Sequence, residues 1–311
     1  MPAELGIIGG YLGSGKSTLI NRLLDGVLPG RTAVVVNDFG SVNIDSALIA
    51  SSSQDTIELT NGCICCQITD DVSRTMTALA ARADLDRVLC EVSGVGDPRQ
   101  LASWRAYPGF SAGPILVCAD TTAIAGLLRN EYVSDTVERQ LAVADVVLLT
   151  KTDLAIPPEI ESARQRCSEA APTARILLHD AADPGTAAAA AFVAASRSGS
   201  PAVGGDLPDA GSPDDHAARH SSVTLRDLNG IDMSVLATAL SEQADRLVRA
   251  KGVLQDAQGV WHDIQLSAGR VDRRARSAGP STPALVLIAA GPQAEDEREV
   301  AAQALRAALR M

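Results

Sequence analysis

Lysine is scarce in this sequence. Of its 27 basic side chains only three are lysines, Lys16, Lys151 and Lys251, and the others are arginines. An ammonium is a compact point charge that a planar guanidinium does not replace among phosphate oxygens. Lys16 and Lys151 each lie in a polar motif that follows an apolar run, so we expect ammonium chemistry at both places.

An excess of positive charge, a signal peptide and a long apolar run are also missing. The net charge of −11 excludes nucleic acid as the main partner. No stretch is long enough to span a bilayer, and the N-terminal segment carries acidic Glu4 and no secretory signal. We therefore expect a cytoplasmic protein with no membrane partner, whose six cysteines are free thiols or metal ligands and not disulfides.

Short apolar runs alternate with helical patterns through the first two thirds of the chain. Predicted strands lie near residues 5–8, 32–36, 56–60, 87–90, 114–119, 145–149 and 175–178. This alternation predicts an α/β fold, an open parallel sheet with helices on both faces. In such sheets ligands bind beyond the carboxyl ends of the strands.

A stretch rich in Gly, Ser, Pro, Ala and Asp interrupts this pattern. It divides the chain into a domain over 1–196, a linker over 197–216 and a smaller α+β domain over 217–311. In the last domain we expect strands at 222–228, 252–256, 260–268 and 283–290, and helices at 233–250 and 296–310. The turn at 256–259 is predicted to close a hairpin.

The segment from Gly10 to Ser17 has the spacing G-x-x-x-x-G-K-S between a predicted strand and a predicted helix. Backbone N–H groups in such a loop line an anion site, Lys16 reaches the β and γ phosphates, and Ser17 supplies a hydroxyl to Mg²⁺. The spacing, and the position between a strand and a helix, disfavour the alternative that this is a glycine-rich turn without a ligand. The predicted phosphate-binding residues are Gly13, Ser14, Gly15, Lys16, Ser17 and Thr18.

A second motif, Thr150-Lys151-Thr152-Asp153, lies where a base-reading loop belongs. The Asp153 carboxylate can accept two hydrogen bonds from the ring N–H and the amino group of guanine, an edge that adenine lacks. The stem of Lys151 can pack along the purine face. The same four residues also suit an ordinary strand-to-helix turn, but the upstream phosphate loop favours GTP as the ligand.

Two acidic strand ends are candidates for Mg²⁺ binding and catalysis. Glu91 ends a predicted buried strand and can hold Mg²⁺ directly or through water, and Gly94 can donate its N–H to the γ-phosphate. Asp38 is a second candidate near the metal or the attacking water. Either carboxylate could instead be a solvated strand terminus.

Three thiols lie within four residues, at Cys63, Cys65 and Cys66, too close to form unstrained disulfides with one another. Thiolates suit Zn²⁺ or Cu(I), and three of them leave a fourth tetrahedral position open, as a site that releases its metal requires. The alternative is buried or redox-active cysteine. Of the other cysteines, Cys90 and Cys118 lie in apolar strand runs and are predicted to be core residues, and Cys167 stands alone in a predicted helix. Metal binding is disfavoured for all three.

Two further groups carry weaker signals. His216 and His220 would share a metal only in a helix, and a solvated linker is favoured there. A run of four arginines is predicted to be solvated surface, with a partner contact as the alternative. Its members are Arg270, Arg273, Arg274 and Arg276.

Together these motifs resemble the CobW-like metal-chaperone GTPases, a branch of the P-loop GTPases. The matching segments are 9–18, 37–40, 58–66, 91–94 with 97–98, and 150–154. The resemblance is strong over residues 5–155 and looser beyond, where the family has a comparable small α+β domain after an often histidine-rich linker. Thr150 replaces the family's usual asparagine, Asp38 its usual glutamate, and the linker here is nearly bare of histidine.

The resemblance implies a GTPase, slow without a partner, that delivers a transition metal to a client metalloprotein. Lys16, Ser17 and Glu91 would serve the phosphates and Mg²⁺, Asp153 would read guanine, and the three neighbouring cysteines would hold zinc or cobalt. A nucleotide-dependent metal or redox sensor without a delivery role is the alternative, and a small-molecule kinase or ATPase is a third. Whether the chain forms a homodimer is left open.

Overall fold

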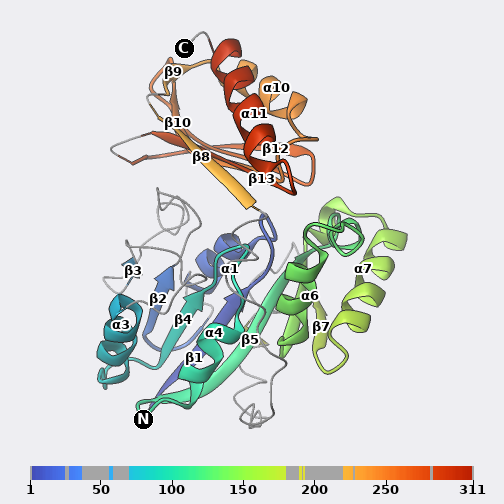
Figure 1. The fold of residues 1–311 in the computed structure, drawn as a ribbon. Helices are drawn as coiled ribbons and strands as arrows, with labels where there is room; N and C mark the ends of the chain where they lie inside the picture. Colours follow the sequence, from blue (N-terminus) through green and yellow to red (C-terminus); the bar gives the residue numbers. More distant parts are fainter. Residues whose placement is uncertain are drawn as a thin grey trace. The chain divides into compact units, whose positions relative to one another are not determined.

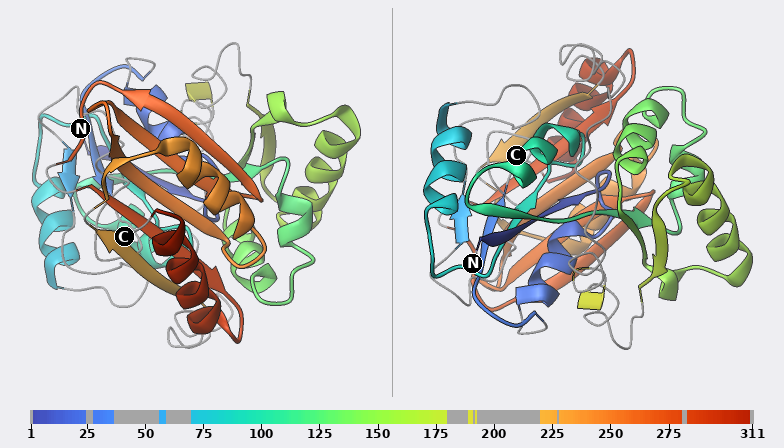
Figure 2. Two further views of the ribbon diagram at one scale, coloured as in Figure 1. Left: turned by 90° about the horizontal axis from the view of Figure 1, so that it is seen from above. Right: turned by 90° about the horizontal axis from the view of Figure 1, so that it is seen from below.

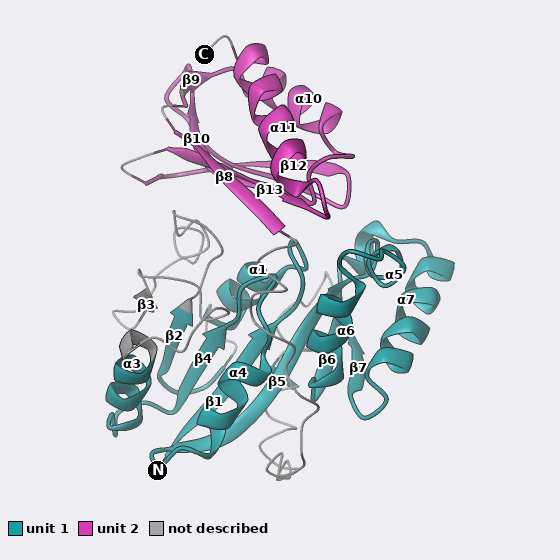
Figure 3. Ribbon diagram, in the orientation of Figure 1, with its two compact units in different colours: residues 1–39, 48–213 teal, residues 40–47, 214–311 magenta. Residues whose placement is uncertain are grey.

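The chain divides into two compact units in the computed structural model (Figure 3). The structure describes residues 2–24, 28–36, 56–58, 70–179, 189–190, 192, 220–226, 228–280 and 283–309. The first unit holds the phosphate-loop motif, and the second holds the C-terminal strands and helices. The linker predicted at 197–216 lies outside the described residues, so the predicted domain boundaries stay a prediction.

A seven-stranded sheet forms the centre of the first unit (Figure 1). Its order is β3-β2-β4-β1-β5-β6-β7, and all neighbouring strands are parallel. The strands are β1 (Ala3–Gly9), β2 (Thr32–Val36), β3 (Thr56–Glu58), β4 (Arg87–Glu91), β5 (Phe110–Asp120), β6 (Val146–Thr150) and β7 (Arg175–Leu178). Strands such as β4 and β6 are buried at every residue, as apolar runs inside a parallel sheet are. The predicted parallel α/β architecture is confirmed.

Helices cover both faces of this sheet, and Figure 2 shows α1 and α4 on opposite sides of it. Leu89 of β4 packs with Ile20 of α1. The next residue, Cys90, points to the other face, where its sulfur lies 3.9 Å from that of Met76 on α3. The helices are α1 (Lys16–Arg22), α3 (Asp70–Ala80), α4 (Arg99–Ala102), η2 (Ser103–Ala106), α5 (Ile124–Leu127), α6 (Ser134–Ala142), η3 (Thr152–Leu154) and α7 (Pro157–Ala170).

The second unit is a mainly antiparallel sheet with two helices packed on one face (Figure 1). Its order is β12-β11-β10-β13-β8, with β9 beside β10. Ile264 and Leu285 from the sheet form one core with Leu236 of α10 and Leu305 of α11. The elements are β8 (His220–Arg226), β9 (Asn229–Ile231), α10 (Met233–Glu242), β10 (Arg249–Asp256), β11 (Trp261–Ser267), β12 (Arg270–Arg276), β13 (Ala284–Ala290) and α11 (Ala294–Ala308).

The predicted hairpin is confirmed, because β10 pairs antiparallel with β11. Asp256 closes the turn by accepting hydrogen bonds from the backbone N–H groups of Gln258 and Val260, at 2.9 and 2.8 Å. Gly259 has a φ of 81°, which favours glycine at that position of the turn.

The helix predicted over 233–250 ends earlier, at Glu242. Arg249 and Ala250 pair with both β11 and β13, and this pairing overrides the helical preference of the alanine- and leucine-rich segment. Within the described residues, no helix is both long enough and apolar enough to cross a membrane.

The structure also describes the arginine run and one of the two histidines. The run of four arginines forms β12, which pairs with β11 and ends the path of the sheet. Its residues are largely exposed, as predicted, and charge on an edge strand discourages pairing with other chains. His220 opens strand β8 and is buried, so the favoured interpretation as solvated linker is wrong for His220, and so is the alternative of a helix that pairs it with His216. His216 itself lies outside the described residues.

Removal of the cap of α10 should destabilise the second unit. The Asp232 carboxylate accepts hydrogen bonds from the N–H groups of Ser234 and Val235, at 2.8 and 3.3 Å. Asp232→Ala should lower the free energy of unfolding of this unit by about 1 kcal/mol. Native-state hydrogen exchange of the β10 and β13 amides measures it. The exposed Asp245→Ala is the control, and an equal loss in both variants would contradict the capping role.

Candidate nucleotide-binding site

Four neighbouring strands of the first unit end at the same edge of the sheet. The register aligns Ile8 of β1 with Glu91 of β4, and Asp120 of β5 with Thr150 of β6. Because the strands are parallel, the polar groups that follow them gather at this carboxyl edge. The phosphate-loop motif and the motif around Thr150 therefore lie in one place, although they are far apart in the sequence.

The phosphate loop takes a conformation that requires glycine. Gly10, Gly13 and Gly15 have φ values of 132°, 78° and 92°, in the region that other residues rarely adopt. A Cβ on Gly10 would lie 2.4 Å from the carbonyl oxygen of Cys118 in β5. The loop thus lies directly against the sheet before α1 begins at Lys16.

The Lys16 ammonium lies over this loop and is 5% exposed. Its Nζ donates hydrogen bonds to the carbonyl oxygens of Gly10, at 2.7 Å, and Tyr11, at 3.3 Å. These contacts satisfy a buried charge and fix its place at the loop. An anion bound by the loop would lie beside a cation that is already in position.

Ser17 and Glu91 bring a hydroxyl and a carboxylate together. The Ser17 Oγ donates to Glu91 Oε1 at 3.5 Å, and the Glu91 side chain is 1% exposed. Both are hard oxygen ligands, the type that Mg²⁺ prefers, so the donor set fits this ion. Thr18, which follows in α1, is exposed.

Gly94 lies against the phosphate loop from the side of β4. A Cβ at this position would be 2.3 Å from Leu12 Cδ2 and 2.9 Å from Leu12 Cα. Only glycine therefore fits without displacing Leu12. The close contact places the backbone after β4 beside the loop where phosphates would bind.

Thr150 links the two motifs through its hydroxyl. Its buried Oγ1 donates to the carbonyl oxygen of Ser14 in the phosphate loop at 2.8 Å, and it lies 3.2 Å from that of Ala119 in β5. Its own carbonyl accepts from the N–H and hydroxyl of Thr121, at 3.0 and 2.7 Å. Thr150 is thus a bridge between β5, β6 and the phosphate loop.

Lys151 and Asp153 follow in a tight turn. Lys151 has a φ of 55° and precedes the short η3, in which Asp153 is exposed. The Lys151 Nζ forms an ion pair with Asp120 Oδ2 at 2.6 Å, and Asp120 is 4% exposed. Asp120 also accepts hydrogen bonds from the N–H and hydroxyl of Thr122.

The sequence analysis gave Asp120 no role. A signal was present, because an acidic residue ends β5 at the level where β6 reaches Thr150 and Lys151. The ion pair shows that Asp120 orients the Lys151 side chain. Asp120 therefore joins Lys151 in the part of the candidate site that the sequence predicts to bind the base.

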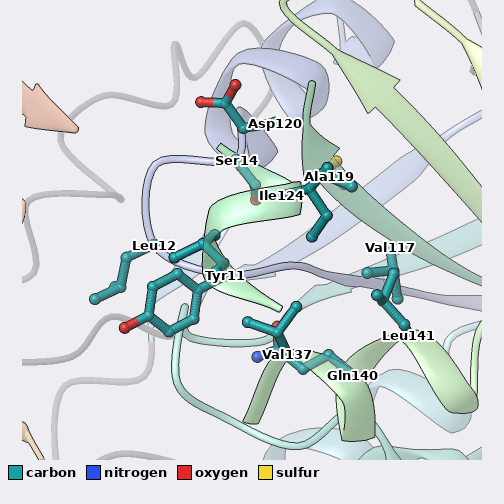
Figure 4. Close-up of a pocket in the computed structure, with 12 residues that line it drawn as sticks. Tyr11, Leu12, Ser14, Val117, Ala119, Asp120, Ile124, Val137, Gln140 and Leu141 are labelled. Carbon is teal, nitrogen blue, oxygen red and sulfur yellow. The ribbon is translucent and has the colours of Figure 1, made fainter. Parts of the chain in front are cut away.

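A cavity of about 10 Å³ lies behind the phosphate loop, between β5 and α6 (Figure 4). Its lining includes Leu12, Ser14, Asp120 and Gln140. A volume of this size holds no more than about one water molecule. The loop is therefore closely packed on this side, with no room there for a nucleotide.

Four of the predicted site residues lie outside the described residues, namely Asp38, Cys63, Cys65 and Cys66. The described chain contains no group of three or more His, Cys, Asp or Glu side chains that could hold a metal ion. Burial raises the pKa of the thiols of Cys90, Cys118 and Cys167 to about 12, so they stay protonated. The prediction that Cys90 and Cys118 are core residues is confirmed, and Cys167 of α7 is buried as well.

The fold and the glycine loop with Lys16 define a P-loop nucleotide-binding protein. Residues 4–177 match the family model described as CobW/HypB/UreG, nucleotide-binding domain. The chain belongs to this family, which confirms the resemblance seen in the motifs.

Curated relatives of the chain carry names of zinc proteins. It is 27% identical to "Zinc chaperone CobW" of Sinorhizobium sp over 91% of this chain and 84% of the relative. It is 35% identical to "Zinc chaperone YeiR" of Escherichia coli over 56% of this chain and 53% of the relative. It is 36% identical to "Zinc-regulated GTPase metalloprotein activator 1" of Dictyostelium discoideum over 31% of this chain and 23% of the relative. Zinc chaperones and GTPases therefore both occur among the relatives.

Loss of the Thr150 hydroxyl should weaken nucleotide binding. Thr150→Val keeps the shape but leaves the buried Ser14 and Ala119 carbonyls without this donor, at a cost of about 1–3 kcal/mol. We expect the Kd for GDP to rise about tenfold, because about 1.4 kcal/mol corresponds to that factor. Titration with a fluorescent GDP measures it. Thr150→Ser retains the hydroxyl and should bind like the wild type, and equal Kd values for wild type and Thr150→Val would contradict the bridge.

Proposed function

We propose that the protein is a GTP-hydrolysing metallochaperone that binds a transition metal, zinc or cobalt, and delivers it to a client protein. The observation that carries this proposal is the gathering of a phosphate loop, the Ser17–Glu91 pair and the Thr150 bridge at one sheet edge. Membership of the CobW/HypB/UreG family and the zinc-chaperone relatives support it.

The phosphates would bind on the N–H groups of residues 13–18, with Lys16 beside the β and γ groups. Ser17 and Glu91 would hold Mg²⁺, which neutralises charge on the phosphates when it is bound. Gly94 would donate its N–H to the γ-phosphate. We expect slow turnover without a partner, because none of the motifs supplies an arginine to the transferred phosphate.

Guanine would be read by Asp153, with Lys151 packed along the purine. Asp120 holds the Lys151 ammonium at 2.6 Å, and this pair fixes the side chain before the base arrives. Thr150 cannot supply the carboxamide that the family usually has at this position. Its hydroxyl instead joins the base-reading turn to Ser14 of the phosphate loop.

The transferred metal is the cargo, and we assign it to the thiolates of Cys63, Cys65 and Cys66. In a reducing compartment such as the cytoplasm these thiols are available as ligands. Three thiolates leave one tetrahedral position for a ligand of the client, so the metal can be passed on without being released into solution.

The register of the sheet supports a coupling between this metal and the nucleotide. Val36 pairs with Glu58, and Val35 with Cys90, so Glu58 of β3 and Glu91 of β4 lie at the same level. The two strands are separated by β2 alone, a distance of about 10 Å. Cys63 follows Glu58 by five residues, a reach of at most about 18 Å.

GTP would tighten the metal site and hydrolysis would loosen it, so by linkage the metal would raise GTP affinity by the same factor. Titration of Zn²⁺ against a chelating indicator, with GDP and with a non-hydrolysable GTP analogue, tests this. We expect affinity at least about fivefold higher with the analogue, at the low end of typical couplings. Equal affinities would contradict the coupling, and tight binding that survives Cys65→Ala would contradict the site. Reversible thiol oxidation without client stimulation would favour a sensor instead.

Asp153→Asn should change the base preference. An asparagine amide presents N–H donors where the carboxylate presented only acceptors, so it matches the 2-oxo group of xanthine and not the 2-amino group of guanine. We expect GDP affinity to fall at least about 100-fold, since charged hydrogen bonds contribute about 1.5–3 kcal/mol each. Competition by xanthosine diphosphate should improve in parallel. The control is Glu159→Gln, at a neighbouring exposed carboxylate. Unchanged base selectivity in Asp153→Asn would contradict the assignment of guanine recognition to Asp153.

A further inference from the structure

The segment that follows β4 is a short turn enclosed on two sides. Val92 N donates to the carbonyl oxygen of Ile8 in β1 at 2.9 Å, and Gly96 N donates to that of Ser93 at 2.9 Å. One side of the turn meets the phosphate loop, where Gly94 has no room for a Cβ beside Leu12. We refer to residues 93–96 as the glycine turn.

The other side of the glycine turn meets the buried side chain of Gln140 on α6. Gln140 is 1% exposed, and its Nε2 donates to the carbonyl oxygens of Gly94, at 3.2 Å, and Gly96, at 2.7 Å. Because both partners are acceptors, only the amide nitrogen can face them, and this settles the orientation of the side chain. Gln140 thus directs its amide N–H groups to one turn. The two acceptors, Gly96 and Gly94, lie 44 and 46 residues earlier in the chain.

The α6 helix that carries Gln140 also packs behind the phosphate loop. Val137 and Leu141 line the same small cavity as Ser14, and Figure 4 shows the three α6 side chains Val137, Gln140 and Leu141 together at its border. The phosphate loop, the glycine turn and α6 therefore form one packed group. Gln140 is the polar contact between α6 and the turn.

We propose that Gln140 is a positioning residue that holds the glycine turn ready for the γ-phosphate, and so favours GTP over GDP. The inference rests on the proposed nucleotide function. Without the two hydrogen bonds, the turn would have to be ordered when the γ-phosphate binds, which costs conformational entropy. GDP has no γ-phosphate, so its affinity does not depend on this ordering.

Gln140→Met tests the proposal, because it keeps the length of the side chain and removes both donors. We expect the affinity for a non-hydrolysable GTP analogue to fall about tenfold, as the loss of two hydrogen bonds implies. The Kd for GDP should stay within about twofold of the wild type. The analogue-to-GDP affinity ratio, measured by calorimetry, is thus the readout, and a purely structural role would not change it. An unchanged ratio would overturn the proposal.

Two further variants sharpen the test. Gln140→Glu keeps the size and places carboxylate oxygens against two carbonyl oxygens, so its ratio should fall at least as far as in Gln140→Met. Gln165→Met on the exposed face of α7, where the Gln165 amide contacts Glu169, is the matched control and should leave the ratio unchanged. A lower ratio in the control, or a wild-type ratio in Gln140→Glu, would overturn the proposal.

A measurement on the wild type covers the case in which a Gln140 variant fails to fold. The Gly96 amide should exchange slowly in the nucleotide-free protein, because the turn is already held. Exchange at the rate of an open loop, slowed only by the analogue, would overturn the proposal. Wild-type turnover of GTP tests the proposed function separately: a protein that binds both nucleotides but hydrolyses no GTP contradicts the GTPase and leaves the ratio test intact. A protein that binds neither contradicts both.

Discussion

The hydrogen bond from the Thr150 hydroxyl to the Ser14 carbonyl joins two segments that are 136 residues apart. It connects the turn after β6 to the loop after β1, across the end of β5. Because backbone carbonyls in this buried region need donors, the bond ties the relative positions of the two motifs to the strand register of the sheet. A nucleotide that bridged them would then find its phosphate and base contacts at a fixed separation.

Both lysines of the candidate site are held by the protein itself. Lys16 donates to two loop carbonyls, and Lys151 pairs with the buried Asp120. Burial of an ammonium is costly unless it is hydrogen-bonded or paired. These contacts therefore stabilise both ammonium groups at the site before a ligand binds. An ammonium has three donors and can therefore share them with an arriving anion. Lys16 and Lys151 are thus positioned before binding, which lowers the entropy that binding must overcome.

The local features of this site could be predicted from the sequence, and the features that depend on packing could not. Glycine spacing fixed the place of Lys16, since the loop needs positive φ at Gly10, Gly13 and Gly15. Apolar runs located the strands of the parallel sheet, because such strands are buried on both faces. The two bonds of Gln140 and the Asp120 ion pair join segments distant in the chain, and no local pattern encodes such pairs. The end of α10 at Glu242 has the same origin, since pairing of Arg249 with two strands decided it.

The contacts divide the site into two parts, and the protein itself holds both of them. The phosphate loop, β5 and the Thr150 turn are joined by backbone-directed bonds that no nucleotide state needs to break. The glycine turn after β4 is held by the Gln140 amide and by packing against Leu12, so a γ-phosphate would meet a turn that is already in place. β4 lies beside β2, β2 lies beside β3, and the cysteine segment follows β3 in the sequence. Under the proposed function, a γ-phosphate would add its contacts on the β4 side of the sheet, and the base would bind on the β5 and β6 side.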